Sequence, residues 1–187
     1  MSEPAKKNAI YEDLYSIPEN TLGEIVNGKL VVTPRPGRKH GYVTTIVIEQ
    51  VGPAYHGGRG GPGGWIFIVE PEIILGKHIM VPDVAGWKSG RFPREEEANP
   101  ISAVPDWVCE ILSSPKGELY DRSEKMPIYA HYGLPHAWLI NPGIKSLEAY
   151  RLEHGRWSTL GVYGERRKTP IEPFTEIELD LGEFWLE

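Results

Sequence analysis

Three apolar stretches of the sequence carry carboxylates where a buried β-strand is expected. Glu110 lies within WVCEIL, Asp83 within IMVPDVAGW, and Glu70 and Glu72 within WIFIVEPEIILG. A charged carboxylate in an apolar strand is costly unless it is paired, protonated or bound to a cation. Neighbouring carboxylates also repel, and a hard divalent cation removes that conflict, because Mg²⁺ binds carboxylate and phosphate oxygens. The pattern therefore predicts a Mg²⁺ or Mn²⁺ site at the sheet.

Side-chain alternation places these acids on particular strand faces. In the stretch 107–112, Trp107 and Cys109 share one face and Glu110 lies on the other. Glu70 and Glu72 are two positions apart, so we expect them on one face of a single strand. Any one acid alone is equally well explained as a solvated strand end or the partner of an arginine. Their succession on neighbouring strands favours a functional site.

The elements that must position these acids follow from turn signals and hydrophobic periodicity. Asn-Gly between apolar runs is the strongest short hairpin signal, and a glycine after an amphipathic run ends a helix. We expect, in chain order, a hairpin (23–26 and 29–33, turning at 27–28), a helix (40–56), two antiparallel strands (65–76 and 78–87), a strand at 107–112, a helix (116–133), a strand (136–142), a strand pair (146–164) and short strands to residue 187. The order predicts a mixed α/β sheet covered by helices.

Length, charge and cysteine content narrow the class of protein. A chain of 187 residues suits a single domain over 1–187, in which residues 1–9 form a flexible tail. The net charge of −6 argues against binding of nucleic acid by bulk electrostatics. A single cysteine, Cys109, excludes an internal disulfide and indicates a reducing, cytoplasmic location. No apolar run is long enough for a transmembrane helix, so no membrane partner is expected.

Several segments resemble the Uma family of predicted endonucleases, within the PD-(D/E)XK, restriction-endonuclease-like superfamily. They are VPDVAGW, PDWVCEILSSP and YDRSEKMPIYAHYGLPHAWLINP, together with GEIVNGKLVVTPRPGRKH near the start and LEAYRLEHGRW near the end. The resemblance covers most of the chain, and the ordered set is specific where one segment alone would be weak. It implies an α/β (mixed α+β) restriction-endonuclease-like core: a central mixed β-sheet flanked by helices, with an extra N-terminal hairpin and C-terminal strands.

The resemblance also implies a nuclease-type metal site. Asp83 matches the aspartate of the Pro-Asp motif and Glu110 the acid of the third core strand, so both are expected as catalytic metal ligands. The superfamily pattern places a lysine at position 112, where this chain has Leu112. A lysine from the following helix then takes that catalytic role and maps to Lys125. Glu72 is a candidate further metal ligand.

A small basic cluster precedes the first long helix. His40 matches a histidine common in the family, and Arg35, Arg38 and Lys39 lie beside it. We expect His40, Arg38 and Lys39 to bind substrate. The cluster either meets phosphates or is a solvated loop, and the sequence leaves both readings open.

Asp121 lies one helical turn before Lys125 and is expected on the same helix face. It either orients the lysine or forms a solvated ion pair with it. Exposed pairs at this spacing are common and worth little, which favours the solvated pair.

Two functions from different classes stay open, so the sequence does not decide whether the chain is an enzyme. In the first, the chain is a Mg²⁺-dependent endonuclease that hydrolyses DNA: Asp83 and Glu110 hold the metal, and Lys125 polarises the attacking water. In the second, it is a catalytically silent interaction or nucleic-acid-binding domain. The three retained site residues favour the nuclease, whereas the acidic charge and Leu112 favour the silent domain. DNA is the expected partner, RNA is an alternative, and a homodimer is one assembly left open.

Overall fold

The computed structural model describes residues 8–95 and 99–186. Most of the predicted N-terminal tail (1–9) lies outside the described residues. The elements are η1 (Tyr11–Ser16), β1 (Thr21–Val26), β2 (Lys29–Pro34), α1 (Arg38–Tyr55), β3 (Trp65–Val69), β4 (Ile73–Leu75), β5 (His78–Met80), β6 (Val84–Lys88), β7 (Trp107–Ile111), α2 (Pro115–Tyr120), η2 (Asp121–Lys125), α3 (Met126–His131), β8 (His136–Asn141), β9 (Ser146–Glu153), β10 (Arg156–Tyr163), β11 (Lys168–Ile171), β12 (Phe174–Asp180) and η3 (Leu181–Phe184).

The largest sheet has six strands in the order β10-β9-β8-β7-β6-β3. β7 and β8 are parallel and the other neighbouring pairs are antiparallel, so the sheet is mixed. Parallel neighbours need a crossover connection, which α2, η2 and α3 provide. A second sheet has the order β2-β1-β5-β4, and β11 pairs with β12. The predicted mixed α+β fold is thus confirmed, with its N-terminal hairpin and C-terminal strands.

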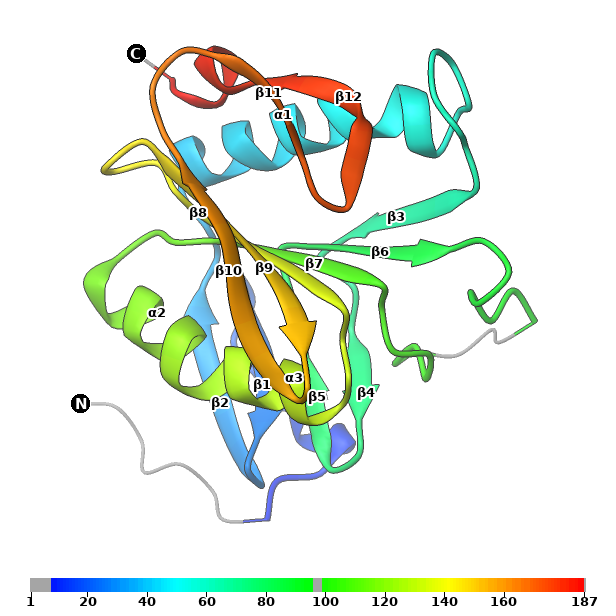
Figure 1. Ribbon diagram of the computed structural model, residues 1–187. Coiled ribbons are helices and arrows are strands. Elements are labelled where there is room, and N and C mark those ends of the chain that lie inside the picture. Colours follow the sequence, from blue (N-terminus) through cyan, green and yellow to red (C-terminus); the bar gives the residue numbers. More distant parts are fainter. Residues whose placement is uncertain (1–7, 96–98, 187) are drawn as a thin grey trace.

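Hydrophobic cores lie on both faces of the six-stranded sheet. α1 and the β11–β12 hairpin cover one face, where Trp107, Trp138 and Phe174 pack edge to face (Figure 1). The crossover helices and the four-stranded sheet lie on the other side, where Val108 and Leu112 are buried (Figure 1). The sheet is therefore the middle layer of the fold, and a polar side chain on β7 must enter one of two apolar layers.

The parity prediction for β7 is confirmed. Trp107 and Cys109 belong to the core under α1, and Val108 belongs to the opposite core. Glu110 shares the face of Val108, and only 2% of its surface is exposed. Its carboxylate therefore lies between β7 and the crossover helices.

The two predicted strands 65–76 and 78–87 are each broken, so the prediction that Glu70 and Glu72 share one strand face is wrong. The chain leaves the six-stranded sheet after β3, forms β4 and β5 in the other sheet, and returns as β6. The breaks contain Pro71 and Pro82. Proline lacks the N–H that a sheet ladder needs and restricts the residue before it. Glu70 takes a left-handed φ of 48°, and Asp83 lies at the return, immediately before β6.

The predicted hairpin and its turn are confirmed. β1 and β2 pair in register from Thr21–Pro34 to Val26–Lys29. Asn27 and Gly28 have φ values of 52° and 71°, as a two-residue turn with the favoured twist requires.

The predicted helix 116–133 contains a feature that periodicity did not indicate. Residues 115–131 are continuously helical, but Asp121–Lys125 form a π-turn in which the Met126 N–H bonds to the Asp121 carbonyl. Single π-turns are rare and occur frequently at functional sites. The helix begins at Ser114, whose hydroxyl accepts the Gly117 N–H, and Gly133 follows its end with φ 75°.

No helix within residues 8–95 and 99–186 is both long and apolar enough to cross a membrane.

Candidate active site

Four carboxyl groups and two basic side chains gather where β7 meets the break before β6 and the π-turn. They come from six places in the chain: Glu24 on β1, His40 on α1, Asp83 before β6, Glu110 on β7, and Asp121 and Lys125 in the π-turn. Strands of both sheets and the break before β6 supply three of the acids, and the helices supply Asp121 and the two basic groups. The structure thus brings together Asp83, Glu110, Lys125 and His40 of the predicted site.

Lys125 lies in a cage of three acceptors. Its Nζ is 2.8 Å from Glu110 Oε1 and 3.2 Å from Glu24 Oε1, and it donates to the Val81 carbonyl at 3.1 Å. An ammonium group has three N–H donors, and these contacts account for all three. The side chain is 4% exposed, so the expectation of a solvated Asp121–Lys125 pair is wrong. The π-turn directs Lys125 inward to carboxylates on two strands.

Glu110 is held as firmly as the lysine that it faces. The Tyr129 hydroxyl donates to Glu110 Oε1 at 2.6 Å, on the same oxygen that meets Lys125. Burial raises the pKa of Glu110; the Lys125 ammonium opposes this, and the nearby negative charges of other acids add to it. Burial lowers the pKa of Lys125, but the negative charges of Glu110 and Glu24 raise it by more. The lysine therefore stays charged. Glu110 and Lys125 form a buried, hydrogen-bonded ion pair.

Asp83 is oriented by two donors on its two oxygens. The Ile111 N–H donates to Oδ2 at 2.6 Å, and His40 Nε2 lies 2.9 Å from Oδ1. The first contact joins the break before β6 to β7, one residue beyond Glu110. The second joins it to the first turn of α1. The two predicted metal ligands are therefore fixed to the same strand.

Asp121 is a further acid of the group with a raised pKa. Burial raises its pKa to about 7, although Lys125 lowers it; Asp83 and Glu24 raise it further. The Lys125 ammonium contacts Glu24 and Glu110 instead. Asp121 is half-buried and is placed by the π-turn beside the carboxylates rather than in a surface pair.

Comparisons with known proteins identify the family of this chain. A family model named Uma2, described as "Putative restriction endonuclease", matches residues 10–182. The chain belongs to the Uma2 family. The structure is also similar to a crystal structure from Anabaena variabilis described as "a putative nuclease belonging to DUF820", with a TM-score of 0.71 and 25% identity over 93% of this chain and 96% of that one. The search of curated proteins found no match.

The donor chemistry of this Uma2 site suits a hard divalent cation. Within the described residues, no three His, Cys, Asp or Glu side chains are grouped as metal ligands. Mg²⁺, however, is commonly held by one or two carboxylates together with water and substrate phosphate oxygens. The site has four carboxyl groups against one lysine and one histidine, and two of those acids have raised pKa values. Asp83 and Glu110 therefore fit the cation that the family implies.

The other predicted site residues do not enter the buried cluster. Glu72 accepts a hydrogen bond from the Tyr11 hydroxyl, and its carbonyl accepts the Ile101 N–H. The structure does not bring Glu72 to Asp83 or Glu110, because the break at Pro71 directs it toward η1. Arg38 and Lys39 are exposed on the first turn of α1, next to His40.

Sequence reasoning missed Glu24, Tyr120 and Tyr129. Glu24 is buried, accepts the Val81 N–H at 2.7 Å and lies 3.3 Å from the Tyr120 hydroxyl. Its signal was present, since LGEIV places an acid in an apolar strand as WVCEIL does. The tyrosines gave no such signal, because a tyrosine in an amphipathic helix is ordinarily a core residue.

Proposed function

We propose that this Uma2 protein is a divalent-metal-dependent endonuclease that hydrolyses phosphodiester bonds of DNA. The observation that carries the proposal is the fixing of Asp83 and Glu110 to one strand, beside a buried charged lysine. This is the acid pair and lysine of a PD-(D/E)XK-type site, with the lysine supplied from the crossover helix instead of from position 112.

Each residue has a definite part in this proposal. Asp83 and Glu110 would hold Mg²⁺ or Mn²⁺, which lowers the pKa of a bound water and neutralises charge on the phosphate. His40 and the Ile111 N–H keep Asp83 in place. Lys125 holds Glu110 and adds a fixed positive charge that stabilises the developing negative charge. It contributes through its field, because its three N–H groups already have acceptors.

The proposal also covers the substrate, the oligomeric state and the cellular location of the protein. Arg38 and Lys39 would meet substrate phosphates, since they are exposed beside His40. The family supports a nucleic acid as substrate; DNA in preference to RNA is our proposal. A single domain over 1–187, a homodimer and a cytoplasmic location stay predictions.

A catalytically silent interaction domain is the second candidate. The full engagement of Lys125 by protein acceptors and the apolar burial of Leu112 favour it. In that case the same cluster would only stabilise the fold.

Nicking of supercoiled plasmid and cleavage of oligonucleotides, with Mg²⁺ or EDTA, separate the two. We expect cleavage only with the metal. Asp83→Asn and Glu110→Gln should each lower it by roughly a hundredfold or more, the scale of losing a preorganised group at a reacting centre. Lys116→Ala, at an exposed position of α2, is the control and should cleave as the parent does. A metal-loaded parent that cleaves no nucleic acid would establish the silent domain instead.

A further inference from the structure

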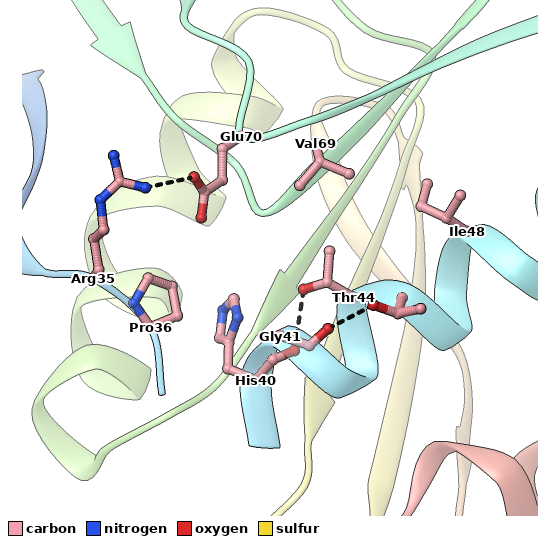
Figure 2. Close-up of a pocket in the computed structure, with 9 residues that line it drawn as sticks. Arg35, Pro36, His40, Gly41, Thr44, Ile48, Val69 and Glu70 are labelled. Carbon is pink, nitrogen blue, oxygen red and sulfur yellow. Dashed lines mark hydrogen bonds and ion pairs between the residues drawn. The ribbon is translucent and has the colours of Figure 1, made fainter. Parts of the chain in front are cut away.

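A cavity of about 490 Å³ lies against the candidate site. α1 forms one side of it, and Val69 and Glu70, at the end of β3, form the other (Figure 2). His40 lines the cavity with one edge and reaches Asp83 with its Nε2. The Glu70 N–H also donates to the Asp83 carbonyl at 3.0 Å. The cavity therefore borders the residue that is expected to hold the metal.

Its lining is mainly apolar. Pro36, Ile48 and Val69 present hydrocarbon, and Val69 is 47% exposed. Thr44 and Thr45 add their methyl groups, because their hydroxyl protons are donated to carbonyls one turn earlier on α1. Exposed apolar surface inside a concave site is typical of a ligand site rather than of a solvated face.

A glycine lies in the wall of the cavity. Gly41 lines it, and a Cβ built there would have no heavy atom within 4 Å. Gly41 lies within α1, where glycine is less favourable than alanine by about 1 kcal/mol. Position 41 therefore has room for a larger side chain at the wall of the cavity.

The polar groups of the cavity suit the edge of a base better than a phosphate. Arg35 and Glu70 lie 3.9 Å apart at the mouth and present donors beside an acceptor (Figure 2). The Glu70 carboxylate would repel a phosphate but accepts hydrogen bonds from ring N–H or amino groups. Phosphates are better met by Arg38 and Lys39, which are exposed at the start of α1.

We propose that this cavity receives one unpaired nucleobase of the substrate, next to the phosphate that is cleaved. The assignment rests on the proposed nuclease function and adds a substrate class to it: single-stranded or locally unpaired DNA. A base in a duplex is paired and stacked, so it reaches a pocket only after leaving the stack.

Binding measured in EDTA tests the cavity without any cleavage. Labelled oligonucleotides of equal length, single-stranded or duplex, are compared by fluorescence anisotropy. The parent should bind the single strand about tenfold more tightly, on the scale of burying part of one base against apolar side chains. Gly41→Leu fills the cavity and should lose that preference, whereas Gly41→Ala should lose less. Gly52→Ala on the same helix, whose Cβ makes an ordinary 3.8 Å contact with Ile48, is the control and should bind as the parent does. Equal parent affinity for both forms, or full affinity in Gly41→Leu, overturns the proposal.

A second measurement needs no variant. A duplex that carries one unpaired 2-aminopurine should change its fluorescence on binding to the parent, and the fully paired duplex should not; identical responses would refute the pocket. Failures of the two proposals look different. Single-strand preference without cleavage leaves the base pocket and removes the nuclease. Equal cleavage of duplex and single strands by both parent and Gly41→Leu leaves the nuclease and removes the pocket.

Discussion

At the scale of residues, the positive charge of Lys125 balances the buried carboxylates of Glu24 and Glu110. Its ammonium is buried between carboxylates from β1 and β7, with a backbone carbonyl as third acceptor. Removing one partner of a buried ion pair is costly, because the remaining charge is left without compensation. Glu24 and Glu110 thus depend on one cation, and the fold at this point depends on all three.

Lys125→Met tests this dependence through stability. The variant keeps most of the side-chain volume but leaves two buried carboxyl groups facing each other, so the free energy of unfolding should fall by about 3–5 kcal/mol. Urea unfolding at neutral pH measures it. Lys116→Met, at an exposed position of α2, should change the free energy by less than about 0.5 kcal/mol.

A double variant sharpens the result. Adding Glu110→Gln to Lys125→Met removes one of the repelling charges and should recover part of the lost stability. If Lys125→Met unfolds like the parent, or if the second change adds a further full loss, the charge-balance account of the cage is wrong.

At the scale of elements, the crossover helix carries the site, and a hydrogen-bond network anchors its π-turn to the sheet. Arg122 donates to Glu148 of β9 through two nitrogens, at 3.0 and 2.5 Å, and to Glu118 at 2.9 Å. The Tyr150 hydroxyl also donates to Glu148. The π-turn that places Asp121 and Lys125 is therefore fixed from its outer side as well.

Glu148→Gln removes the charge that Arg122 binds, so it should lower the stability of the protein in a pH-dependent way. Hydrogen bonds from Arg122 lower the pKa of Glu148 in the folded protein, so the stabilisation is present above the unfolded pKa of about 4.3 and is lost as pH falls through the folded pKa. At pH 7 the free energy of unfolding of the parent should exceed that of the variant by about 1–2 kcal/mol. The difference is modest because Arg122 is one-third exposed, so its charge is partly screened.

Urea unfolding at several pH values between about 7 and 3 measures this difference, which should shrink at the acid end. Glu178→Gln, at an exposed position of β12, is the control and should stay within about 0.5 kcal/mol of the parent throughout. A Glu148→Gln difference that is constant or grows toward acid would exclude the anchor.

The elements show what the sequence could and could not predict. Local signals sufficed for the Asn27-Gly28 hairpin, for the helices, and for the face of Glu110, because each depends on neighbouring residues. The breaks at Pro71 and Pro82 were missed, since the apolar runs continue across both and only the choice of sheet changes. The π-turn was missed because it adds a single residue to a helical repeat.

The composition of the site was predictable only in part, for the same reason. Asp83 and Glu110 were indicated by acids in apolar strands and by the family resemblance, whereas the role of Lys125 came from the resemblance alone. All three lie together in the structure. Glu24 belongs with them because β1 pairs with β5, a contact between distant segments that local pattern does not show. Glu72 was assigned to a strand that does not continue as far as its position.

At the scale of the whole molecule, the net charge of −6 limits how a nucleic acid could be held. Binding must depend on a few local cations, and Arg38 and Lys39 are the exposed pair beside the site. Affinity should accordingly vary only weakly with salt, in contrast to proteins that contact many phosphates.

The salt dependence of single-strand binding makes this quantitative. Each phosphate contact contributes a slope of about −0.7 to the dependence of log affinity on log salt, so two contacts predict about −1.4. Arg38→Ala and Lys39→Ala should each reduce its magnitude by about 0.7, and Lys168→Ala on β11 should not change it. Anisotropy titrations in EDTA at several salt concentrations provide the slope, and an unaltered slope in both variants would remove these residues from the substrate path.

The central claim is that Asp83 and Glu110 together hold a divalent cation. Crystals of the protein soaked in Mn²⁺ test it most directly, because anomalous scattering locates the ion independently of any activity. The account predicts an anomalous peak bonded to carboxylate oxygens of both Asp83 and Glu110, and no peak there in crystals of Asp83→Ala. A parent crystal at millimolar Mn²⁺ with no peak between these two residues would contradict it.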